Sequence, residues 1–166
     1  MKMSTTMAAG IIGALVMTGI MWVARNILGM PVNLEMMLGT MIGMEPSVWA
    51  WFIGFVIHLT AGAVFALLYA EGFEHLTHRA SWLVGLIFGA VHTVFSGFFL
   101  RLIPALHPLI PEQMAAPGLF MSATGAIGVI AFAALHLIYG AIVGGMYGPV
   151  LHPVRHAGHG EPRHAH

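Results

Sequence analysis

Three histidines lie within long apolar runs of the sequence: His58, His92 and His136. At a rise of about 1.5 Å per helical residue, all three fall near the middle of a membrane-spanning helix, at similar depth. Polar side chains at that depth are costly, usually face other helices, and are candidates for function. Histidine ligates transition metals and haem iron. These residues therefore predict a site for haem b or for iron, copper or zinc.

The alternative is that each histidine only packs, donating a ring N–H to a neighbouring helix. Hydroxyl groups that could accept such a bond stand in the same runs: Thr60, Thr93, Ser96 and Tyr139. For a single histidine we would favour this packing role. Because three histidines lie at one depth, a bound cofactor stays a possible interpretation. Gly62, Gly89 and Gly140 each lie about one turn from a histidine. We interpret these glycines as leaving room for a flat cofactor or an ion.

Two glutamates occur at corresponding places in the loops after the first and third apolar runs: Glu35 and Glu112, each four residues after a proline. Carboxylates on the same membrane face could bind a cation or relay protons. A carboxylate in the first turn of a short helix also stabilises the helix dipole, and we favour that structural role. Asn33 is a typical N-cap residue, so a short interfacial helix is predicted over 34–42.

The loop after the second run carries a further candidate metal site. Glu71 with His75, and Glu74 with His78, have the i,i+4 spacing that can chelate a divalent ion. Five more histidines lie in the polar tail, 151–166. The alternative, which we prefer, is a solvated loop and tail that take up metal weakly without a function.

The elements that position these residues are four apolar runs. Hydrophobic residues make up 58% of the 166 residues and charged residues only 7%, against about 25% in soluble domains. Lipid must therefore be the solvent for most of the surface. The runs that are long enough to span a bilayer are 7–24, 48–70, 82–100 and 125–148.

An internal repeat relates the two halves of the chain. His58-Leu-x-x-Gly-Ala aligns with His136-Leu-x-x-Gly-Ala, and the flanking runs and loops match at a similar offset. The repeats cover about 7–70 and about 82–148. We predict an all-α membrane protein: a four-transmembrane-helix bundle built from two repeated helix-loop-helix hairpins, with a pseudo-two-fold axis along the membrane normal.

The distribution of basic residues predicts the orientation of this domain, residues 1–150. Lys2, Arg79, Arg155 and Arg163 fall on one side, and Arg25 and Arg101 on the other. By the positive-inside rule, both termini lie in the cytoplasm, and 151–166 is a histidine-rich cytoplasmic tail.

The paired His-Leu-x-x-Gly-Ala segments and the glycine-rich end of the fourth run, through Gly148, carry a resemblance. The chain resembles a family of short bacterial four-span inner-membrane proteins of unknown function. The resemblance covers most of the chain and implies bacterial origin and the fold. It brings no activity, cofactor or site residue.

Three functions are compatible with these features, and we rank them in the following order. The first is a non-catalytic accessory subunit, because the chain is small and presents small-residue faces to other membrane subunits or to copies of itself. The second is a metal- or haem-binding protein using His58 and His136, with His92 beside them. The third is a channel or carrier for a small solute or protons. Enzymatic motifs are missing from the sequence, aspartate does not occur, and zero net charge makes nucleic acid an unsuitable partner.

Overall fold

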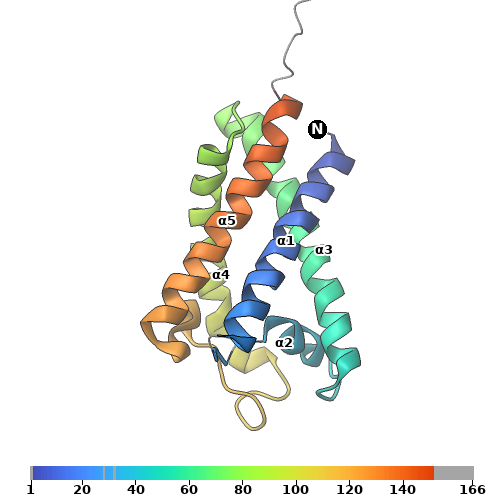
Figure 1. Cartoon of the computed structure of the whole chain (residues 1–166), viewed down its shortest axis with the longest axis vertical. Coiled ribbons are helices and arrows are strands. Elements are labelled where there is room, and N and C mark those ends of the chain that lie inside the picture. Colours follow the sequence, from blue (N-terminus) through green and yellow to red (C-terminus); the bar gives the residue numbers. More distant parts are fainter. Residues whose placement is uncertain (1, 28, 32, 152–166) are drawn as a thin grey trace, which may run out of the picture.

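The computed structural model describes residues 2–27, 29–31 and 33–151, and this part of the chain is helical without strands. The predicted tail lies outside the described residues from 152 onward. Figure 1 shows the helices in chain order: α1 (Met3–Asn26), α2 (Leu34–Met41), α3 (Val48–Gly72), η1 (Phe73–Thr77), α4 (Trp82–Leu106), η2 (Leu119–Thr124) and α5 (Gly125–Leu151).

Four of the helical segments are long and apolar enough to cross a membrane, which confirms the four predicted spans. They are Met3–Asn26, Val48–Thr77, Trp82–Leu106 and Leu119–Leu151. Each is longer than the predicted run, in some spans because a charged residue ends the apolar run without ending the helix. Arg101, for example, lies inside α4.

Side-chain caps explain where three of the helices begin. Ser47 and Ser81 accept hydrogen bonds from the backbone N–H groups of Ala50 and Val84, at the starts of α3 and α4. Asn33 accepts from Met36 N–H at 3.2 Å, which confirms its predicted capping of α2.

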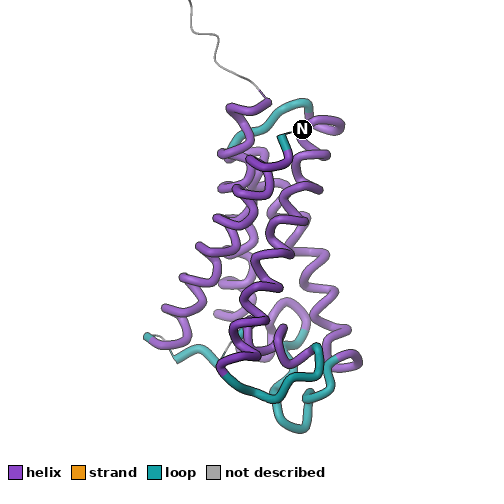
Figure 2. The backbone as a smooth tube through the Cα atoms, turned by 90° about the vertical axis from the view of Figure 1, so that its right-hand side faces the viewer, coloured by secondary structure: helices purple, strands orange, loops and turns teal. Residues whose placement is uncertain are grey.

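The helices are arranged as two hairpins that meet through α1 and α5 (Figures 1 and 2). α1 packs on α3, α4 packs on α5, and α1 also packs on α5. α2 lies against α3 at the end of the bundle opposite the N-terminus. The start of α1 and the end of α5 lie at the same end.

Glycines allow the helix backbones of this bundle to approach closely. A Cβ on Gly89 would lie 2.5 Å from the His136 carbonyl oxygen, and one on Gly140 would lie 2.2 Å from that of Gly85. At Gly62, a Cβ would lie 2.8 Å from the Cβ of Ala14. Neighbouring helices therefore pack directly against these glycines. Gly62 also lines a cavity between the helices, so the prediction that the glycines leave room for a cofactor stays a prediction.

The two long loops differ in structure. The first contains α2, whereas the described residues between α4 and α5 form turns followed by the 3-10 helix η2. Pro108, Pro111 and Pro117 interrupt the second loop, and proline both lacks a backbone N–H and restricts the residue before it. The two sequence-related loops therefore place their glutamates in different surroundings.

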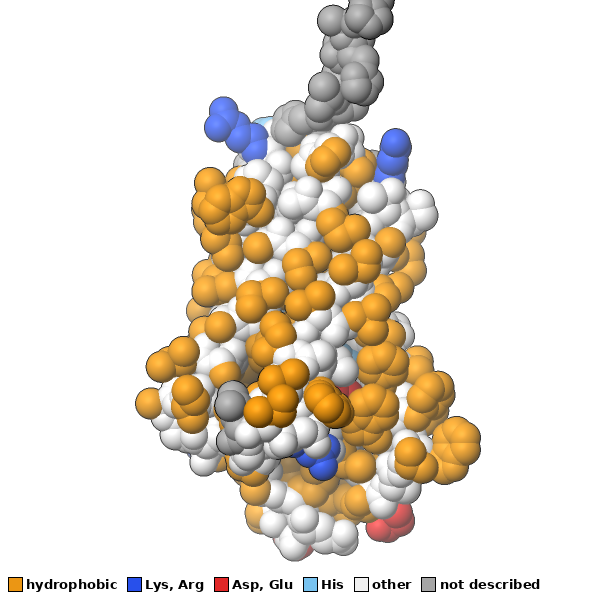
Figure 3. All heavy atoms as spheres, in the orientation of Figure 1, with side chains coloured by type: hydrophobic (Ala, Val, Ile, Leu, Met, Phe, Trp, Pro, Cys, Tyr) orange, Lys and Arg blue, Asp and Glu red, His pale blue; other side chains and the backbone are white. Residues whose placement is uncertain are grey.

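Apolar side chains cover much of the face of the bundle that Figure 3 shows. Large hydrophobic side chains of the described helices, such as Trp49, Ile87, Phe95 and Ile130, are mostly exposed. In water such a large apolar surface would promote aggregation, whereas in lipid it is the expected outer face. The helices therefore contact the lipid bilayer.

Candidate functional site

A cavity of about 560 Å³, partly open to the outside, lies between the helices and reaches loop residues such as Met30 and Met114. His58 of α3, His92 of α4 and His136 of α5 all line it. The rest of its wall is formed mostly by apolar side chains, among them Met17, Phe65, Leu100, Phe132 and Leu135. The structure thus brings the three mid-membrane histidines to one cavity.

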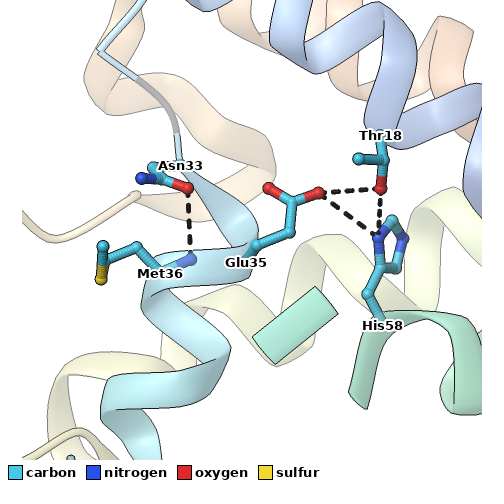
Figure 4. Close-up of polar contacts among 5 residues, drawn as sticks. All are labelled: Thr18, Asn33, Glu35, Met36 and His58. Atoms are coloured by element: carbon cyan, nitrogen blue, oxygen red, sulfur yellow. Dashed lines mark hydrogen bonds and ion pairs between the residues drawn. The ribbon is translucent and has the colours of Figure 1, made fainter. Parts of the chain in front are cut away.

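His58 belongs to a hydrogen-bonded group that joins three helices (Figure 4). The Thr18 hydroxyl of α1 donates to Glu35 Oε1 of α2 at 2.8 Å and lies 3.0 Å from His58 Nδ1. His58 Nδ1 is also 3.7 Å from the same Glu35 oxygen. Glu35 is 5% exposed and His58 8% exposed, so these hydrogen bonds lie largely out of contact with solvent.

The close docking of α2 on α3 puts Glu35 in this position. A Cβ on Gly54 of α3 would lie 1.7 Å from the Glu35 carbonyl oxygen, and one on Gly39 of α2 would lie 1.8 Å from that of Ala50. The two glycines let the α2 and α3 backbones touch. The Glu35 side chain therefore reaches into the bundle and not along the membrane surface.

The hydrogen bonds determine which nitrogen of His58 carries its proton. The Thr18 hydroxyl has one proton and donates it to Glu35, so its oxygen accepts from His58 Nδ1–H. Neutral His58 therefore has a lone pair on Nε2.

His136 has the same tautomer for a different reason. Its Nδ1 lies 2.8 Å from the Phe132 carbonyl oxygen, which can only accept, so Nδ1 carries the proton and Nε2 the lone pair. His92 Nδ1 lies 3.2 Å from the Tyr69 hydroxyl, which can donate or accept. The His92 and His136 ring centroids are 4.8 Å apart in an edge-on arrangement.

Among the described residues, His58 and His136 make their hydrogen bonds to protein through Nδ1 and not through Nε2. In the described part of the chain, every fully buried side-chain nitrogen and oxygen has a hydrogen-bond partner. Each ring uses its Nδ1 for its hydrogen bond to protein, and both residues line the cavity. The lone pair on each Nε2 is therefore available to a group inside the cavity.

The titratable side chains do not form a ready-made site for a bare metal ion. Within residues 2–27, 29–31 and 33–151, no three His, Asp or Glu side chains are placed to hold one. A structural metal ion typically takes four protein ligands. A ligand for this cavity must therefore supply most of the coordination, or bind without a metal.

Glu35 carries its charge in spite of its buried position. Burial raises the pKa of its carboxyl, but the His58 ring N–H, its own backbone N–H and the Thr18 hydroxyl act against burial. Together they prevail, and the pKa lies below its ordinary value. Glu35 also lies in the first turn of α2, as the helix-dipole interpretation expects. Glu112 is exposed in a turn.

The candidate metal-binding residues near the end of α3 do not gather into one cluster. Glu71 Oε2 and His75 Nε2 are 3.2 Å apart on the surface, an exposed ion pair of the kind that contributes about 0–1 kcal/mol. Glu74 accepts a hydrogen bond from Tyr147. His78 has a φ of 51°, which takes it out of the helical spacing that pairing with Glu74 requires.

His107 is a buried residue that sequence reasoning passed over. Its Nδ1 accepts from Leu109 N–H at 3.1 Å, so Nε2 carries the proton and donates to the Met37 carbonyl at 3.0 Å. Thr40 Oγ1 lies 3.1 Å from the same Nε2. His107 thereby connects α2 to the end of α4.

The hydrogen-bonding roles of Thr18 and Tyr69 are also not predictable from the sequence, because a single hydroxyl in an apolar run does not indicate its partner.

These features define a class: a multi-pass membrane protein of four spans, with a histidine-lined cavity inside the bundle. The chain belongs to the family of unknown function DUF6789, whose model matches residues 1–157. This confirms the resemblance to a family of unknown function. No match was found among curated proteins or among solved structures.

Proposed function

We propose that this protein is a membrane-embedded binding protein that holds a lipid-soluble, cofactor-sized ligand in the cavity between its helices. The observation that carries the proposal is the meeting of three histidines in one cavity of about 560 Å³ with otherwise mostly apolar walls. Small-molecule sites typically measure about 300–1,000 Å³ and combine apolar walls with a few polar groups. The histidines would meet the polar part of the ligand.

The other two functions have less support. An accessory subunit is compatible with ligand binding, but the exposed apolar faces of α1, α3, α4 and α5 do not distinguish a partner from lipid. A channel or carrier requires a polar path, whereas the cavity wall is mostly apolar. A binding role without catalysis remains our prediction.

Filling the cavity tests the proposal. Ala131 lines the cavity, so Ala131→Trp should occupy the space needed by the ligand. We expect the ligand recovered per mole of protein, measured by native mass spectrometry and extraction from mild detergent, to fall at least tenfold, about 1.4 kcal/mol of binding.

The matched control is Ala90→Trp, an exposed position on α4 that does not line the cavity. This variant should retain the ligand of the wild-type protein. Equal occupancy in both variants, or wild-type protein that carries only bulk membrane lipid, would contradict the proposal.

We also propose that the two hairpins, about 7–70 and 82–148, are repeats, and that the protein sits in a bacterial inner membrane with both termini cytoplasmic. The shared Nδ1–H tautomer of His58 and His136 supports the repeat. The excess of basic residues on the side of the termini supports the orientation.

Single cysteines test the orientation, because the chain has no cysteine of its own. Glu112, in the turns after α4, and Leu76, in η1 after α3, are exposed at opposite ends of the bundle. Glu112→Cys should react with a membrane-impermeant maleimide in intact cells, and Leu76→Cys only after the membrane is permeabilised. The reverse pattern would place the termini outside.

A further inference from the structure

We infer that the ligand of the cavity is a planar metal macrocycle of the haem type, with His58 Nε2 and His136 Nε2 as its axial ligands. This inference rests on the proposed function, because it names the chemistry of the molecule that the cavity holds.

The hydrogen bonds behind the two histidines are the first step. A histidine that ligates a metal through one nitrogen usually donates its other ring N–H to a carboxylate or a backbone carbonyl. His136 donates to the Phe132 carbonyl, and His58 donates to Thr18, which in turn donates to Glu35. Both rings are thus held with a lone pair on Nε2.

The number of protein ligands is the second step. In the described residues, histidines and carboxylates do not supply the three or four ligands that a bare ion takes from protein. A macrocycle brings its own in-plane nitrogens and needs only axial ligands, for which histidine is a common choice. The apolar wall formed by residues such as Phe65, Leu100 and Phe132 suits the faces of such a ring.

The groups that accept a hydrogen bond from the two histidine rings differ. This difference identifies Glu35 as a positioning residue. A charged carboxylate stands behind His58 through Thr18, whereas a neutral carbonyl stands behind His136. The carboxylate strengthens the hydrogen bond of His58 Nδ1–H and so raises the donor strength of Nε2. Glu35→Gln should therefore weaken the metal–nitrogen bond at His58 while the cavity stays the same.

Titration of the full-length protein with iron protoporphyrin in detergent, followed by its absorption spectrum, tests the inference. Wild-type protein should bind one equivalent with the spectrum of two nitrogenous axial ligands. His58→Leu and His136→Leu should each lose that spectrum and bind at least tenfold more weakly. Glu35→Gln should bind about 10–100-fold more weakly, as outer-shell changes typically do.

Two controls distinguish loss of axial ligation from misfolding of the variants and from porphyrin binding to histidines on the surface. Metal-free protoporphyrin needs no axial ligand, so wild-type and histidine variants should bind it equally if the variants are folded and the cavity is intact. His75→Leu removes an exposed histidine and keeps the tail, and should match wild type.

The outcomes also separate this inference from the proposed function. If Ala131→Trp displaces a native ligand, but iron protoporphyrin does not bind or binds the double variant His58→Leu/His136→Leu as tightly as wild type, the inference is overturned and the proposed function stands. If Ala131→Trp changes neither the native ligand nor the binding of both porphyrins, both fail.

Discussion

Gly54→Ala should lower the free energy of unfolding by about 3 kcal/mol, at the upper end of the range for overpacking. The new Cβ would lie 1.7 Å from the Glu35 carbonyl oxygen and 2.7 Å from the Gly39 backbone nitrogen. Both clashes are with backbone, so no side-chain rotation relieves them. α2 must move off α3, and the Glu35 carboxylate moves away from Thr18 and His58 with it.

Thermal unfolding in detergent measures this loss, and hydrogen exchange should show faster exchange in α2. Gly19→Ala in α1 is the matched control, because no atom outside its local backbone lies within 4 Å of a Cβ built there. Alanine is the better helix former, so this variant should equal wild type or gain up to about 1 kcal/mol. A similar loss in both variants would show that backbone contact between α2 and α3 is unimportant.

Glu35→Ala should lower the free energy of unfolding by about 2–3 kcal/mol, since it leaves buried polar groups without their partner. The Thr18 hydroxyl would lose its acceptor, and His58 Nδ1 the nearby negative charge. Glu112→Ala is the control from the corresponding loop. Because Glu112 is exposed, its removal should change stability by less than about 0.5 kcal/mol. Equal effects of the two changes would contradict a special role for Glu35.

The direction in which pH changes the stability difference between wild type and Glu35→Ala can be predicted. The pKa of Glu35 is lowered in the folded protein, so its contribution is complete above the ordinary carboxyl pKa of about 4.3. That contribution is lost as the pH falls through the lower folded value. The stability gap between wild type and Glu35→Ala should therefore stay constant at neutral pH and narrow in acid.

The spans, the helix starts and the depth of the histidines could be predicted from the sequence. A span requires only about 20 consecutive apolar residues, and a cap requires only one residue before a helix. Asn33 before α2 and the mid-membrane placement of His58 and His136 are of this kind. Each depends on residues that are neighbours in the chain.

The partners of the buried polar groups were beyond sequence reasoning. Thr18 lies 17 residues from Glu35 and 40 from His58, so no local pattern relates these residues. The two glutamates stand at corresponding positions of the loops, yet one is buried and the other exposed. Prolines in the second loop, by excluding a helix like α2, account for that difference.

The number of apolar spans, and the place of each histidine along its span, follow from the order of the residues alone. The tertiary structure alone decided which sides of those helices face one another. α3 and α5 are apolar on all sides, so no periodicity distinguishes the inner face from the face that meets lipid. Close backbone contacts, such as Gly85 against Gly140 and Gly54 against Glu35, set those rotations. The cavity and its hydrogen-bonded histidines exist only once these contacts are made.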